Sequence, residues 1–112
     1  MKFEYKGVKL QIWRSHYDDG HTALILVDLF NMSYLATLTV CTPGFNFPSD
    51  ELAIKAWSEN EEIAEICFQT GVFEDTGKRG ANEKVTVEFW KMKKPYSFDL
   101  FPMIKYELLN VE

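Results

Sequence analysis

The stretch that decides the fold is residues 58–71, which reads SENEEIAEICFQTG. Ser58 is a favourable helix N-cap, and Glu61 lies three residues later, where its carboxylate can return a hydrogen bond to the Ser58 amide in a capping box. Gly71 suits the left-handed conformation that ends many helices. The stretch therefore predicts one main helix over about residues 59–70.

The predicted helix has an apolar face and an acidic face. At 3.6 residues per turn, one side of the helix carries Ile63, Ile66, Cys67 and Thr70, with Ala64 at its edge. Glu61, Glu62 and Glu65 fall on the opposite side. We therefore expect the first face to pack against a sheet and the second to face water.

Negative charge is concentrated around this helix. Residues 50–75 contain eight acids and one base, which gives a net charge of −7, whereas the remaining residues contain nine acids and eleven bases. The helix dipole explains acids in the first turn, but Glu65 lies a turn later, four residues after Glu61, where like charges repel. Two interpretations remain open: a solvated helix face, or a patch that binds a basic partner surface. The patch would consist of Glu61, Glu62, Glu65, Glu74 and Asp75.

Alternating segments surround the helix and predict strands. They lie at residues 3–5, 8–17, 22–30, 34–41, 52–57 and 85–92, and residues 76–82 contain two glycines and predict a surface turn. Short connections between the first four segments predict an antiparallel meander. The expected fold class is α+β, with an antiparallel sheet of five to six strands and the helix over about 59–70 packed on one face.

The chain has the length of a single domain, residues 1–112. We expect a core over residues 1–94 and an appended C-terminal tail over residues 95–112. The tail is too apolar to stay in water, so it docks on its own sheet or joins a second copy as a homodimer. Its periodicity fits a strand or a helix, and both alternatives remain open.

Composition restricts the function classes. The net charge of −5 argues against direct binding to nucleic acid or to an anionic membrane, both of which attract clustered lysine and arginine. Two cysteines do not make a disulfide framework, so a reduced, cytoplasmic location is expected. No cofactor-binding motif is present, and we expect no cofactor. Cys67 lies on the apolar helix face, where core packing is expected, and Cys41 has no evident role.

The segment His16–His21 places two imidazoles and two carboxylates within six residues. Zinc or iron could use such groups, and a small metal-dependent or hydrolytic enzyme would then rely on His16, Asp18, Asp19 and His21. However, Asp18 and Asp19 precede Gly20 in an ordinary turn pattern, and no third ligand cluster occurs elsewhere in the sequence. The turn is the better interpretation.

Two further motifs are weak. Residues 77–80 read GKRG but lack the ending of a phosphate-binding loop. Trp90 could stack on bases beside nearby lysines, as in single-strand binding. Strict alternation places Trp90 and Lys94 on one face and Lys91 and Lys93 on the other, which would divide the basic patch.

The centre of the chain resembles a family of small uncharacterised proteins carried by phages and bacterial mobile elements. The matching residues are 34–40 (YLATLTV), 54–61 (IKAWSENE), Gly71, 74–77 (EDTG) and the closing strand at 85–92. The resemblance covers roughly residues 1–92. It implies no catalytic residues, and it implies a setting in which many accessory proteins bind and blunt host defences.

Together these observations predict a small, non-catalytic protein-interaction module. The expected partner is a basic surface of a bacterial protein, for which a nucleic-acid-handling defence enzyme is one candidate. The alternatives are the metal-dependent or hydrolytic enzyme at His16–His21 and a homodimeric accessory protein joined through the tail.

Overall fold

The computed structural model describes residues 1–42, 45–81 and 85–104. In chain order its elements are β1 (Lys2–Tyr5), β2 (Val8–His16), β3 (Thr22–Asp28), β4 (Ser33–Thr37), β5 (Glu51–Ile54), the 3₁₀-helix η1 (Ser58–Asn60), α1 (Glu61–Gln69), β6 (Phe73–Ala81), β7 (Thr86–Met92) and the 3₁₀-helix η2 (Phe98–Leu100). Within this part of the chain the fold is α+β with one α-helix, which confirms the expected class.

The first four strands form one sheet in the order β1-β2-β3-β4, with each strand antiparallel to the next. Lys6 and Gly7 make the first turn with φ angles of 51° and 80°, as in the tight hairpin turns that match the twist of a sheet. Alternation along β2 buries Leu10 and Ile12 on one face. The meander is confirmed for these strands.

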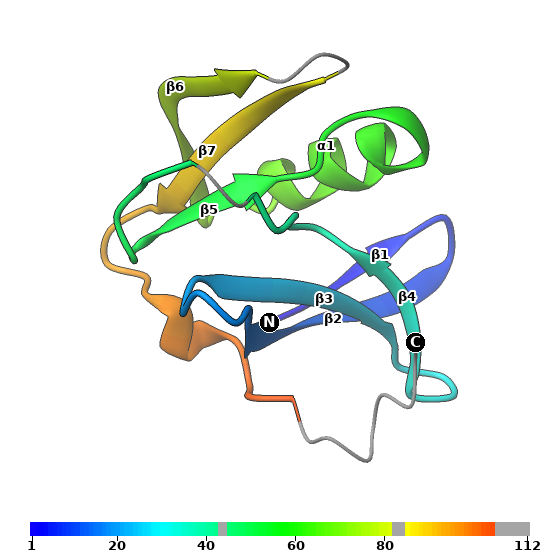
Figure 1. Cartoon of the computed structure of the whole chain (residues 1–112). Helices are drawn as coiled ribbons and strands as arrows, with labels where there is room; N and C mark the ends of the chain where they lie inside the picture. Colours follow the sequence, from blue (N-terminus) through cyan, green and yellow to red (C-terminus); the bar gives the residue numbers. More distant parts are fainter. Residues whose placement is uncertain (43–44, 82–84, 105–112) are drawn as a thin grey trace.

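The prediction of a single sheet of five or six strands is wrong. The last three strands form a separate antiparallel sheet in the order β5-β7-β6. Figure 1 shows this smaller sheet and α1 on one side of the molecule and the four-stranded sheet on the other. The molecule therefore has two sheets facing each other, with α1 beside the smaller one.

The sheets separate because the chain crosses between them after β4. Leu38 donates its N–H to the Leu24 carbonyl in the first sheet at 2.9 Å, and Val40 donates to the Ala53 carbonyl in the second at 2.9 Å. The strand predicted at 34–41 is therefore shorter, because its second half passes from one sheet to the other. Alternation indicates which side chains share a face, and it does not specify the pairing partner.

The surface turn predicted at 76–82 is also wrong. These residues lie mostly within β6, whose pairing with β7 shifts between Asp75 and Arg79. Gly77 has a φ of 84° at this irregularity. A β-bulge places a glycine inside a strand, and sequence patterns read that glycine as a turn.

The helix begins differently from the prediction. Ser58 has a φ of 58° and opens η1, and Asn60 occupies the N-cap position of α1. Ser58 is therefore not the cap of α1, because it lies within η1 and α1 begins only at Glu61. The Asn60 side chain donates to the carbonyl oxygens of Thr37 at 2.8 Å and Lys55 at 3.0 Å. Gly71, with a φ of 87°, follows the helix as predicted.

The main core lies between the two sheets and α1. It is formed by buried residues of both sheets and of α1: Leu10, Ile12, Leu24, Leu26, Leu38, Leu52, Ile54, Ile63, Ala64, Cys67, Val72, Phe73, Trp90 and Phe101. Ala53, Val87 and Phe89 form a second cluster on the other face of the smaller sheet, covered by Val40, Phe45, Phe47 and Trp57.

The described part of the tail packs against the body. Phe101 is fully buried and stacks on Phe73, with ring centroids 5.9 Å apart. The Arg14 N–H donates to the Pro102 carbonyl at 2.9 Å, and the Ile104 N–H donates to the Arg14 carbonyl at 2.9 Å. The tail through Ile104 thus contains η2 and a short bridge to β2; residues 105–112 lie outside the described part.

Candidate functional site

Three of the five acids expected in the patch line one groove. Glu61 and Glu65 reach it from α1, and Asp75 from β6. A fourth carboxylate, Glu88 of β7, was not expected and lines the same groove, whose volume is about 450 Å³. We call this site the acidic groove and define it by Glu61, Glu65, Asp75 and Glu88.

The acidic groove has an aromatic floor. Phe68 of α1 is 39% exposed and contacts the buried Trp90 edge to face, with centroids 5.0 Å apart. Trp90 Nε1 donates to Glu88 Oε1 at 3.0 Å, which orients this carboxylate. The groove therefore combines an accessible aromatic surface with fixed negative charge.

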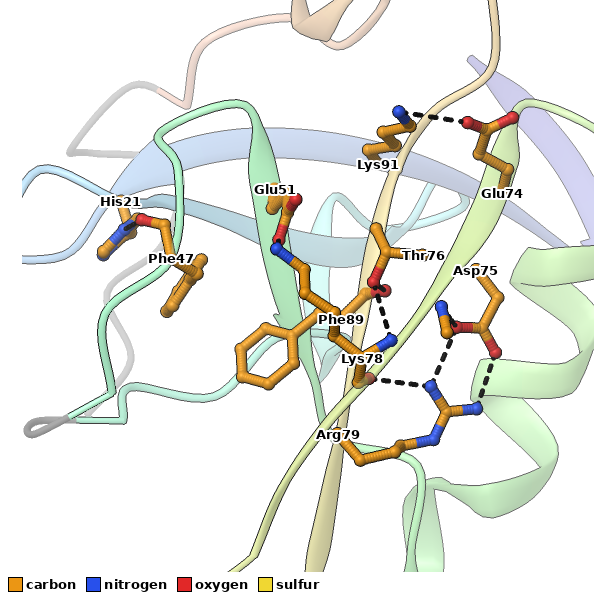
Figure 2. Close-up of polar contacts among 11 residues, drawn as sticks. His21, Phe47, Glu51, Glu74, Asp75, Thr76, Lys78, Arg79, Phe89 and Lys91 are labelled. Atoms are coloured by element: carbon orange, nitrogen blue, oxygen red, sulfur yellow. Dashed lines mark hydrogen bonds and ion pairs between the residues drawn. The ribbon is translucent and has the colours of Figure 1, made fainter.

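One cation lies within the acidic groove region, at Arg79. Its guanidinium donates to both oxygens of Asp75, at 2.9 and 2.7 Å, and the Gly77 N–H donates to Asp75 Oδ1 at 2.8 Å. Figure 2 shows Asp75 and Arg79 on the side of β6 that is toward α1. Arg79 is the main cause that lowers the pKa of the Asp75 carboxyl.

The other three carboxylates of the groove are not paired with a cation of the described residues: Glu61 and Glu65 are exposed, and Glu88 is half-buried. Within residues 1–42, 45–81 and 85–104, Glu61, Glu65 and Glu88 form no ion pair. Arg79 forms an ion pair with Asp75 and not with Glu88, although the charge of Glu88 contributes to the raised pKa of Arg79. A cationic ligand would therefore meet three carboxylates that have no ion-pair partner among the described residues.

Glu62 lies apart from the acidic groove. Its Oε1 atom accepts the Tyr5 hydroxyl and lies 3.2 Å from Lys6 Nζ. These contacts, with that of Tyr5 first, lower the pKa of the Glu62 carboxyl. Glu62 therefore ties α1 to the β1–β2 turn.

Glu74 lies in a different groove. It pairs with Lys91 at 3.5 Å, and both line a hollow of about 630 Å³ that also contains Lys93, Lys94 and Tyr96. The three lysines thus share one groove, contrary to strict alternation, because β7 ends at Met92. Trp90 is only 3% exposed, so it offers no stacking surface to a base.

The remaining charged residues of the smaller sheet pair with one another. Lys78 Nζ lies 2.8 Å from Glu51 Oε1, on the side of β6 away from α1 (Figure 2). The buried oxygen has no hydrogen bond of good geometry with any described residue. The short distance and the opposite charges define an ion pair.

The structure uses His21 for packing. Its Nδ1 lies 3.0 Å from Asp19 Oδ2, its Nε2 lies 2.9 Å from the Phe47 carbonyl oxygen, and its ring stacks on Phe47 at 3.7 Å. His16 is exposed at the end of β2. Among the described residues, no group of three or more His, Cys, Asp or Glu side chains could hold a metal ion.

The two cysteines have different surroundings. Cys67 is fully buried in the main core, which confirms its expected packing, and burial raises the pKa of its thiol to about 12. Cys41 is exposed. Neither lies in the acidic groove.

Comparison with protein-family models, with curated proteins and with solved structures finds no match to this chain. Within the described residues, no helix has the length and apolar character needed to cross a membrane.

Proposed function

We propose that the protein is a non-catalytic interaction module whose acidic groove binds an arginine- or lysine-rich segment of another protein. The observation that carries this proposal is the set of three carboxylates, Glu61, Glu65 and Glu88, that form no ion pair with a described residue and line one groove with the partly exposed Phe68. A guanidinium can donate hydrogen bonds to carboxylates in its plane and stack on an aromatic ring at the same time.

The arrangement of the groove favours a segment of protein as the ligand. Glu61 and Glu65 lie one turn apart on α1, and Asp75 and Glu88 lie on strands of the smaller sheet. A basic segment lying between the helix and the sheet would meet both rows of acids. Charge complementarity of this kind governs the rate of encounter and the choice of partner.

The partner class follows from the chemistry of the groove and from the resemblance stated above. Proteins that bind nucleic acid present rows of lysine and arginine to phosphates. A row of carboxylates can bind to these lysines and arginines in place of the phosphates. We therefore propose a nucleic-acid-handling defence protein of a bacterial host as the partner, met in the cytoplasm.

The proposal is tested by affinity capture from a bacterial lysate. The groove variant is Glu61→Gln/Glu65→Gln/Glu88→Gln. The matched control is Glu4→Gln/Asp18→Asn/Asp50→Asn, which removes the same charge from exposed acids outside the groove. We expect the wild type and the control to retain a basic protein that the groove variant loses, and we expect added salt to release it.

Unfolding of the groove variant would not explain such a loss. Glu61 and Glu65 are exposed, and removing like charges four residues apart relieves repulsion within α1. A partner held equally by all three proteins would contradict the assignment of the site, and capture of no basic protein by the wild type would contradict the function.

A further inference from the structure

The turns of two hairpins lie side by side at one end of the four-stranded sheet. Gly7, Val8 and Lys9 belong to the first hairpin, and Asp28, Leu29 and Phe30 to the second. The Leu29 N–H donates to the Lys9 carbonyl at 3.0 Å, which joins them. These six residues line a hollow of about 500 Å³, and we call them the tip patch.

Phe30 is the most exposed large apolar side chain of the described residues, at 95%. The Asp28 carboxylate accepts the Phe30 N–H at 2.9 Å, so the backbone that carries the ring is held in place. An exposed aromatic ring beside a hollow can anchor a partner, because aromatic side chains are enriched in the cores of protein interfaces.

The tip patch carries one charge of each sign. Lys9 is exposed on β2, and Asp28 is partly exposed at the end of β3. Neither forms an ion pair within the part of the chain that the structure describes. Both charges are therefore available to groups on another molecule.

We propose that the tip patch is the interface of a symmetric homodimer, in which Phe30 of each copy enters the hollow of the other. A two-fold interface requires one surface to be complementary to itself. The tip patch meets this requirement, because it contains an exposed ring next to a hollow and a cation next to an anion. The two-fold axis brings Lys9 of one copy opposite Asp28 of the other.

This dimer is weak and depends on concentration, because the six residues of the tip patch are far fewer than the roughly 20–30 residues per partner of a stable interface. It differs from a dimer joined through the C-terminal tail. It also leaves the acidic groove free, because none of the residues of that groove belongs to the tip patch.

The first test is the mass of the full chain by sedimentation over a range of concentrations. We expect the wild type to dimerise and Phe30→Ser to weaken the dimer about tenfold or more. Tyr96→Ser removes an exposed ring from the tail and should leave the dimer unchanged. A wild type that stays monomeric, or a dimer that Phe30→Ser does not weaken, would overturn the proposal.

A charge exchange tests the symmetry. Lys9→Glu alone and Asp28→Lys alone should each be monomeric, because each places like charges opposite one another at both ends of the interface. A mixture of the two variants should form a heterodimer, which also shows that both are folded. Failure of the mixture to associate while the wild type dimerises would overturn the symmetric arrangement. A wild type that stays monomeric and binds neutral lipid vesicles through Phe30 would show that the tip patch contacts a membrane instead of a second copy.

Discussion

At the scale of single residues, His21 joins the loop of Phe47 to the turn before β3. Both ring nitrogens lie against acceptors, so the ring can donate to both only when it is doubly protonated. Asp19, and then the Phe47 carbonyl, raise the pKa of His21 above 6.5. The stability that this contact contributes is therefore fully present below pH 6.5 and is lost as the pH rises through the raised pKa.

This pH dependence can be measured with His21→Phe, which keeps a ring to stack on Phe47 and removes both hydrogen bonds. We expect the free energy of unfolding of the wild type to approach that of the variant as the pH rises above 6.5. Urea unfolding at a series of pH values gives this difference, and NMR titration gives the pKa of the ring. A difference that stays constant over the whole series would contradict the role assigned to His21.

The cysteines give a second prediction at this scale. The Cys67 thiol, with a pKa of about 12 and no exposure, should not react in the folded protein, whereas Cys41 is exposed. We expect a thiol reagent to label one of the two cysteines at pH 8 and both in denaturant. Rapid labelling of Cys67 under native conditions would indicate that α1 opens from the sheets.

At the scale of elements, the start of α1 differs between the sequence prediction and the structure. Asn60 is buried and holds two carbonyl oxygens, whereas Ser58 is exposed with a positive φ. We expect Asn60→Ala to lower the free energy of unfolding by about 1–3 kcal/mol, because it removes two partly buried hydrogen bonds. Ser58→Ala should change it by less than about 0.5 kcal/mol.

Chemical denaturation of both variants checks this prediction. If Ser58 were the N-cap, its replacement by alanine would cost about 1 kcal/mol. A loss of that size in Ser58→Ala, or a negligible loss in Asn60→Ala, would contradict the account.

The same element shows what the sequence could predict. The acidic and apolar faces of α1 and its end at Gly71 follow from periodicity and glycine chemistry, and the structure agrees with them. The role of Asn60 could not be predicted, because its contact with Thr37 depends on where a distant strand lies. Likewise, Gly77 suggested a turn because a bulge inside β6 is not visible without its pairing partner.

At the scale of the whole molecule, the position of the tail depends on Phe101. This ring is fully buried between Phe73 and the rest of the main core. We expect Phe101→Ala to lower the free energy of unfolding by about 3–5 kcal/mol, the usual cost of removing a buried aromatic ring. Tyr96→Ala, on the exposed part of the tail, is the control and should change it little. Equal effects of the two changes would mean that the tail does not belong to the core.

The division into two sheets was the part of the fold that sequence reasoning could not supply. Alternation at 34–41 predicted one continuous strand, but the Leu38 N–H bonds to the first sheet and the Val40 N–H to the second. Part of the acidic groove could not be predicted for the same reason. The pattern identified Glu61 and Glu65, whereas Glu88 and Phe68 join them only through the packing of α1 beside β7.

The central claim, that the acidic groove binds a basic segment, is tested most directly by NMR titration of the labelled protein with an arginine-rich peptide at low salt. We expect the amide shifts to concentrate on α1 and on the β6 and β7 residues that line the groove, and to disappear in Glu61→Gln/Glu65→Gln/Glu88→Gln. Shifts that are spread over the surface, or that persist unchanged in this variant, would contradict the claim.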